Sequence, residues 1–246
     1  MTKMEYGSEE YLEFRCEEVK EHYEDAMNKA EQTKDQRIVR LVAFAIIDSM
    51  AQEFYNYPAS NASKTFEDFI LEFSNAQYLK EYDPVTLYYD AKENNLMLKN
   101  NLNYLQDGFQ YYIGQINELD GSKKIINEMK QIIENEKNKN YNINNSRSKA
   151  EKILYRHTYI QLIYKYRSKI MHEYHTPVIS PKSIENEEKI SYISCGIGKN
   201  QVWELYIPYA FIKKLAEECM ENFLKYCKNE KRDPFANSRR YDSWYE

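Results

Sequence analysis

Apolar residues recur at alternating intervals of three and four along much of the chain, which is the spacing of one face of an α-helix. Between residues 8 and 32 this stripe consists of Leu12, Cys16, Val19, Tyr23, Ala26 and Ala30. The stretch 34–56 is apolar almost all round and predicts a central, buried helix. Further helices are expected after Ser63, from the DPVTLYY segment at 83–89, and over 123–136, 147–174 and 208–230, with the helical pattern continuing from 83 to Ile116.

A different pattern occupies residues 189–207, where two alternating runs rich in β-branched and aromatic residues flank a turn that contains glycine. This pattern predicts a β-hairpin. No internal repeat and no linker interrupts the chain. The expected fold class is therefore all-α, a helical bundle with a β-hairpin inserted before the C-terminal helix, in a single domain over 1–246 that ends in a tail at 231–246.

One arginine breaks the apolar stripe of the helix expected at 147–174. At 100° per residue, and with Ile160 at zero, the stripe runs from about −80° to about 40° and Arg167 falls near −20°, in its middle. The other stripe positions are Ile153, Ile163, Tyr164, Ile170 and Met171. Because an unpaired guanidinium is costly to bury, this face must meet a carboxylate or open into a polar cleft. Asp48, in the apolar helix at 34–56, is the candidate partner for a structural ion pair.

His172 lies five residues after Arg167 and about 140° further round the helix. The two side chains therefore reach one substrate only through the length of the arginine, through fraying of the helix end, or through a second copy of the helix in a dimer. Arg15 and His22 form a similarly loose pair elsewhere in the chain. Six acidic residues surround that first pair, namely Glu13, Glu17, Glu18, Glu21, Glu24 and Asp25, and they would repel phosphate.

The surroundings of Arg167 are basic instead. Between 147 and 169 a single Glu151 opposes Arg147, Lys149, Lys152, Arg156, Lys165, Arg167 and Lys169. Tyrosines are interleaved with these charges, so single-stranded RNA is a reasonable ligand, since basic groups attract phosphate and aromatic faces stack bases. The substrate-binding candidates are Ser168, Lys169, Lys165, Arg156, Tyr164 and Glu173. The plain alternative is a solvated helix whose tyrosines belong to the core.

Composition narrows the class of protein. A net charge of −5 argues against non-specific coating of nucleic acid, and the 6 Gly and 6 Pro favour long helices over many short strands. The 4 Cys have neither zinc-site spacing nor the density of a disulfide framework, which fits a reducing cytoplasm. The N-terminus is no signal peptide and the longest uncharged apolar run, 41–47, is too short to span a bilayer. We expect a cytoplasmic protein that does not enter membranes.

The segment RSKIMH, Arg167 to His172, resembles the R-x4-6-H signature that marks the HEPN family of small helical bacterial and archaeal domains. The AFAIIDSMAQEFY and DPVTLYY segments are also similar to helical segments of bacterial members. One departure is Ser168, because Asn, Asp or His often follows this arginine in active members.

The resemblance implies a metal-independent endoribonuclease without cofactors. It implies a homodimer whose paired motifs face each other across a cleft, serving as the toxin of a toxin–antitoxin pair or as an anti-phage effector. Arg167 and His172 would be its catalytic residues, with RNA as substrate and an antitoxin or defence protein as a further partner. A histidine can move the protons of ribose 2′-OH attack, and a guanidinium can stabilise the charge on the phosphorane. The expected product is a 2′,3′-cyclic phosphate.

The same sequence is compatible with another class of function. A catalytically inactive HEPN-like binding or scaffold module in a defence complex would keep the same helices. In HEYH, His172 and His175 are three apart, whereas zincins space their two histidines four apart, so no metal site is expected. His157, at the margin of the stripe, is expected to be a packed core histidine. A nucleotide-binding enzyme has no support, because a Gly-rich phosphate loop is lacking.

Overall fold

The computed structural model describes residues 7–55, 61–96, 98–102, 105, 111–113, 116, 119–139, 149–173, 182–195 and 202–236. The chain forms two compact units. The first unit holds the described residues of Met1–Gln77, Arg167–Thr176 and Tyr209–Glu246, and the second unit holds those of Tyr78–Tyr166 and Pro177–Pro208. The single domain over 1–246 stays a prediction. Residues 237–246 of the expected tail lie outside the described residues.

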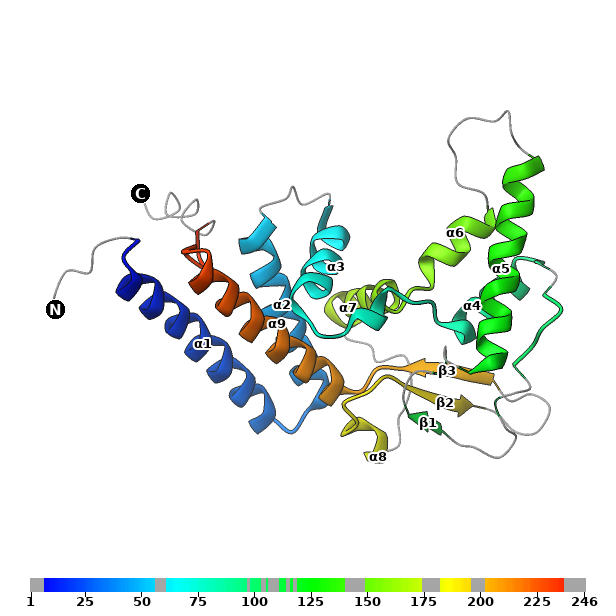
Figure 1. The fold of residues 1–246 in the computed structure, drawn as a ribbon. Helices are drawn as coiled ribbons and strands as arrows, with labels where there is room; N and C mark the ends of the chain where they lie inside the picture. Colours follow the sequence, from blue (N-terminus) through cyan, green and yellow to red (C-terminus); the bar gives the residue numbers. More distant parts are fainter. Residues whose placement is uncertain are drawn as a thin grey trace. The chain divides into compact units, whose positions relative to one another are not determined.

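The first unit is a helical bundle in which α2 (Gln36–Tyr55) packs against its neighbours α1 (Glu9–Gln32), α3 (Ala62–Phe73) and α9 (Tyr209–Asn229) (Figure 1). This confirms the central helix that the apolar composition of 34–56 predicted. Ser8 caps α1 by accepting a hydrogen bond from the backbone N–H of Tyr11 at 3.1 Å. The buried face of α1 follows the predicted stripe, except that Met27 is buried in place of Ala26. The predicted start of α3 was wrong, because Asn61, not Ser63, is its N-cap residue.

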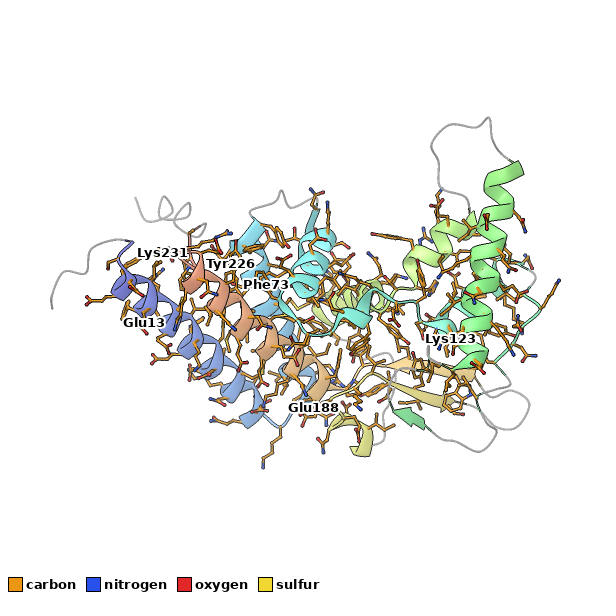
Figure 2. The ribbon with its side chains drawn as sticks, viewed as in Figure 1. Glu13, Phe73, Lys123, Glu188, Tyr226 and Lys231 are labelled. Atoms are coloured by element: carbon orange, nitrogen blue, oxygen red, sulfur yellow. The ribbon has the colours of Figure 1, made fainter. Side chains whose placement is uncertain are left out.

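Aromatic side chains fill the core of this bundle where α2, α3 and α9 meet. Phe54, Phe69, Phe73, Phe223 and Tyr226 pack mostly edge to face, with ring centroids 4.8 to 6.3 Å apart. Figure 2 labels Phe73 on α3 and Tyr226 on α9, whose centroids are 5.6 Å apart. The guanidinium of Arg232 lies over the Phe54 ring at 4.6 Å, so the segment after α9 is fastened to the same cluster.

In the second unit, α4 (Pro84–Glu93), α5 (Asp120–Lys139) and α6 (Lys149–Arg156) share an apolar core. Its buried members are Leu87, Ala91, Met129, Ile133, Ala150, Ile153 and Leu154. Asp83 caps α4 by accepting from the N–H of Thr86 at 2.8 Å, and Pro84 takes the first turn, where its missing N–H costs nothing. Two further short helices are described, the 3-10 helix η2 (Gln77–Lys80) and α8 (Lys182–Glu185).

A small antiparallel sheet completes the second unit, with strand order β1-β2-β3. β2 (Ser191–Cys195) and β3 (Val202–Tyr206) pair in the register Ile193 to Glu204, which confirms the predicted hairpin. β1 (Tyr111–Ile113) adds a third strand on β2. The expected helical pattern up to Ile116 was therefore wrong at 111–113, because pairing with a strand distant in sequence overrides a weak local preference.

A chain of hydroxyl groups runs through the core of this unit. The fully buried Asp83 accepts from Tyr192 Oη at 2.7 Å, and Tyr192 Oη lies 2.7 Å from Tyr159 Oη. Burial raises the pKa of Asp83, although the hydrogen bonds from Thr86 and Tyr192 oppose the rise. The network links the N-terminus of α4 to β2 and to the start of α7, and its satisfied bonds make it structural.

Among the described residues, no helix is long and apolar enough to cross a membrane.

Candidate functional site

The motif lies on α7 (Tyr159–Glu173), and Arg167 there meets the carboxylate of Asp48 on α2. Arg167 Nε donates to Asp48 Oδ2 at 2.9 Å and Nη2 donates to the same oxygen at 2.5 Å. The side chain of Arg167 is 16% exposed and that of Asp48 is 22% exposed. The ion pair suggested by the sequence is thus present, and it sits at the edge of the first unit with solvent reaching both partners.

The electrostatics of this pair follow from its partial burial. Burial raises the pKa of Asp48 above its ordinary value, and the hydrogen bond and charge of Arg167 work against that rise. The guanidinium is fork-shaped and planar, so two donors on one carboxylate oxygen fix its plane as well as its position. Asp48 therefore orients Arg167 and offsets its charge.

Two predictions made from the helical wheel of this segment were wrong, one about Arg167 and one about Tyr164 and Met171. The buried residues of α7 are Tyr159, Ile160, Ile163, Tyr166 and Ile170. With Ile160 at zero they centre near −70°, so Arg167, at about −20°, lies toward one edge of the stripe and not in its middle. Tyr164 is half-buried and Met171 is 37% exposed, so their assignment to the buried stripe was wrong.

The helix expected over 147–174 is in fact two helices, because the chain breaks at His157 and Thr158 between α6 and α7. Thr158 pairs with Tyr82 as an isolated β-bridge. The N–H of Asp83 donates to the His157 carbonyl at 2.7 Å, and the N–H of Tyr159 donates to the Glu81 carbonyl at 2.9 Å. These bonds to a distant segment replace the helical ones, a tertiary effect that no local pattern reveals.

His172 is exposed on the last turn of α7. It lies at about 120° on the wheel, on the face that also holds Ser168 at about 80° and Lys169 at about 180°. Ser168 is half-buried, while Lys169 and Glu173 are exposed. On α7, therefore, His172 shares a face with Ser168 and Lys169. Arg167 lies about 140° round the helix from His172, toward the packed side.

The remaining substrate-binding candidates belong to the second unit. Lys165 Nζ donates to the carbonyl of Arg156 at 2.9 Å, which bridges the break between α6 and α7. The side chains of Arg156 and Lys165 are exposed, and Tyr164 is half-buried. The structure thus joins Arg156 to Lys165, and it pairs Arg167 with Asp48.

His157 is a packed core histidine, as predicted, with an exposed fraction of 7%. Its Nε2 lies 2.7 Å from Asp90 Oδ2 and its Nδ1 lies 2.9 Å from Thr86 Oγ1. Burial lowers the pKa of His157, and the hydrogen bond to Asp90 only partly opposes this. The neutral ring, donating to Asp90 and accepting from Thr86, satisfies both nitrogens.

In the part of the chain that is described, no three His, Cys, Asp or Glu side chains gather as a metal site would require. His175 of the HEYH segment lies outside those residues.

Arg40 is a buried charged residue that sequence reasoning missed. It is 1% exposed on α2 and so more deeply buried than Arg167. Val39 and Ala43, one helical turn on, are buried too. The apolar residues on both sides of Arg40 were the signal available in the sequence.

Comparison of the chain with models of protein families, with curated proteins and with solved structures found no match.

Proposed function

We propose that the chain is a metal-independent endoribonuclease of the HEPN type, acting in bacterial toxin–antitoxin or anti-phage defence. The observation that carries the proposal is the guanidinium of Arg167, which Asp48 holds through Nε at 2.9 Å at a position that solvent reaches. A guanidinium with a fixed plane is suited to phosphate oxygens, because its donors match their geometry and little freedom is lost on binding.

The second component is His172, whose exposed ring is open to a substrate. In the proposed reaction an imidazole accepts the proton of the ribose 2′-OH while that oxygen forms a bond to phosphorus. The bond from phosphorus to the 5′-oxygen breaks, and a protonated imidazole gives its proton to this leaving oxygen. Arg167 stabilises the negative charge that collects on the phosphorane oxygens. The products are a 2′,3′-cyclic phosphate and a 5′-hydroxyl.

The angle between the two side chains bears on how the site is assembled. Because Arg167 and His172 are about 140° apart on one helix, we infer that a homodimer brings Arg167 of one copy to His172 of the other. Such an arrangement is isologous, so each dimer would hold two equal composite sites.

The test is cleavage of a fluorescent single-stranded RNA by the purified full-length chain in the presence of EDTA. Wild type should release fragments ending in a 2′,3′-cyclic phosphate, and His172→Ala, a change at an exposed position, should not. Expression of wild type in a bacterium should arrest growth, and His172→Ala should relieve the arrest. Intact RNA in every condition, together with normal growth, would reject the nuclease.

Mixing two inactive variants tests the composite site. Arg167→Ala and His172→Ala are unfolded together, refolded and assayed as mixed dimers. If the catalytic pair is shared between copies, a mixed dimer regains one intact site, and activity returns to at most about half of the wild-type value per mixed dimer. If the pair lies within one copy, the mixture stays inactive.

A second function is favoured by one observation, namely that Asp48 offsets the charge of Arg167. A neutralised arginine suits an inactive HEPN-like binding or scaffold module in a defence complex. That function predicts a protein that is harmless on expression and leaves RNA intact while still binding RNA or a partner protein.

A further inference from the structure

A polar groove lies in the second unit, and none of its lining residues belongs to the motif. It has a volume of about 400 Å³ and runs along α5 beside the segment at 99–100. Its lining consists of Lys99, Asn100, Lys124, Asn127, Glu128, Gln131, Ile132 and Asn135. Lys123, labelled in Figure 2, lies in the first turn of α5 and is next in sequence to the lining residue Lys124.

The amide side chains in this groove form a regular row. Asn127, Gln131 and Asn135 are four residues apart and therefore lie one above another on successive turns, about 5–6 Å apart. Lys124 continues the row at its N-terminal end, three residues before Asn127. Asn127, Gln131 and Asn135 are exposed, so the row faces solvent and its amide groups are open to a polar ligand.

The opposite wall is held in place by Glu128. Its carboxylate accepts hydrogen bonds from the N–H of Lys99 at 2.5 Å, from the N–H of Asn100 at 3.0 Å and from Asn100 Nδ2 at 2.8 Å. Burial by itself would raise the pKa of Glu128, but these bonds outweigh it and hold the pKa below its ordinary value. The acidic residue of the groove is thus occupied by the wall, which places Lys99 beside the row of amides.

We propose that this groove binds single-stranded RNA, with the amides of α5 on base edges and Lys99 and Lys124 on phosphates. An amide carries a donor and an acceptor together, which is the pattern that pairs bidentately with a base such as adenine. Base edges are open in single strands and occupied in duplexes, so the groove selects unpaired RNA. The proposal rests on the proposed function in one respect, namely that the bound RNA is the substrate of the nuclease. Binding itself needs neither Arg167 nor His172.

A second hollow differs from the groove in its charge. It has a volume of about 240 Å³ in the first unit, and both Glu24 and Glu217 line it. Burial raises the pKa of Glu217, Lys213 opposes the rise, and the nearby Glu31 and Glu221 add to it. The charged lining residues of this hollow are thus two carboxylates and one lysine. A phosphate is repelled there, whereas two lysines and four amides attract it at α5.

Fluorescence anisotropy with a labelled RNA of about twelve nucleotides tests the groove, in a full-length His172→Ala background that leaves the probe uncut. Gln131→Leu should weaken binding about fivefold or more, since one bidentate base contact is worth at least about 1 kcal/mol. Gln52→Leu, an exposed amide on α2, is the matched control and should bind as the parent does. Circular dichroism confirms that each variant is folded.

Salt dependence tests the lysines. Replacing both Lys99 and Lys124 by alanine should make the slope of log K against log salt shallower by about 1.4, because each phosphate contact on a single strand contributes about 0.7. Lys64→Ala, an exposed lysine on α3, should leave the slope unchanged. A duplex RNA of the same length should bind more weakly than the single strand.

The outcomes separate the groove from the nuclease. Loss of RNA binding in the groove variants, with or without cleavage by wild type, supports the groove. Binding that is unchanged in the groove variants, equal for duplex and single strand, or absent altogether overturns it. Unchanged RNA binding in the groove variants, together with cleavage of RNA by the wild type, overturns the groove and leaves the nuclease standing.

Discussion

The first unit contains two arginine–histidine pairs on helices, and they differ in what surrounds them. On α1, Arg15 Nη1 lies 2.5 Å from Glu18, its Nε lies 3.7 Å from Asp233, and its guanidinium stacks over Phe235 at 4.6 Å. On α7, Arg167 binds the carboxylate of Asp48, which projects from the central helix α2. Each histidine of the two pairs is exposed.

The spacing of Arg and His by itself does not define a site. Arg15 ties α1 to the segment after α9 through Asp233 and Phe235, and acidic residues follow it along α1. That setting stabilises a fold and repels phosphate. Arg167 is oriented by Asp48 on the central helix α2 and is followed by the exposed Lys169, so the same two residue types stand in a less acidic setting.

The largest expected effect separates the pairs by activity. Arg167→Ala and His172→Ala should each lower kcat/KM for RNA cleavage by about 10²-fold or more, because each removes charge stabilisation or proton transfer in the transition state. Arg15→Ala and His22→Ala should change it by less than about twofold. Initial rates on one fluorescent RNA check all four variants, and equal losses in both pairs would remove the distinction.

The next effect concerns the partner of the arginine. Asp48→Ala leaves the guanidinium of Arg167 half-buried without that carboxylate, so the free energy of unfolding should fall by about 2–3 kcal/mol, and activity should fall because the plane of the guanidinium is no longer held. Urea unfolding measures the first and initial rates the second. In the double variant with Arg167→Ala the two losses of stability should not add, since the residues are in direct contact. Additive losses would show that the pair is uncoupled.

A third test contrasts the buried His157 with the exposed His22. Because burial lowers the pKa of His157, the unfolded chain binds the extra proton more readily, so stability is full above about pH 6.5 and falls as the pH drops below it. Asp90, Asp83 and Lys165 are the charged groups that act on this ring. His157→Gln should flatten the fall in unfolding free energy between pH 7 and pH 5. His22→Gln, at an exposed histidine, is the control, and an unchanged slope in His157→Gln would contradict the assignment.

The smallest effect is expected for the pair on α1. Arg15→Ala removes partly exposed ion pairs and should cost about 0.5–1 kcal/mol of unfolding free energy while RNA cleavage stays unchanged. Asp233 keeps hydrogen bonds from Tyr11 Oη at 3.0 Å and from the N–H of Phe235 at 2.9 Å, which limits the loss. Thermal unfolding measures the change, and a loss as large as that of Asp48→Ala would place both arginines in one class.

Much of the secondary structure could be predicted because it depends on local pattern. The bounds of α1, α2 and α9 follow from apolar spacing, and the hairpin of β2 and β3 follows from alternation around a turn. The prediction failed at β1 and at the break between α6 and α7. In both places backbone groups form hydrogen bonds to a segment distant in sequence, and the pattern of neighbouring residues does not predict those bonds.

The candidate site shows the same division. From the sequence alone, Arg167 stood out as a charge in an apolar stripe and Asp48 as a lone carboxylate in an apolar helix. Residue types and spacing determined that each needed a polar partner, because an unpaired buried charge is costly. Only the tertiary structure decided that they bind each other across 119 residues and at a position that solvent reaches, since that depends on where the fold places the two side chains. Helical periodicity is a property of a few neighbouring residues, whereas the pairing and exposure of a side chain are properties of the packed whole.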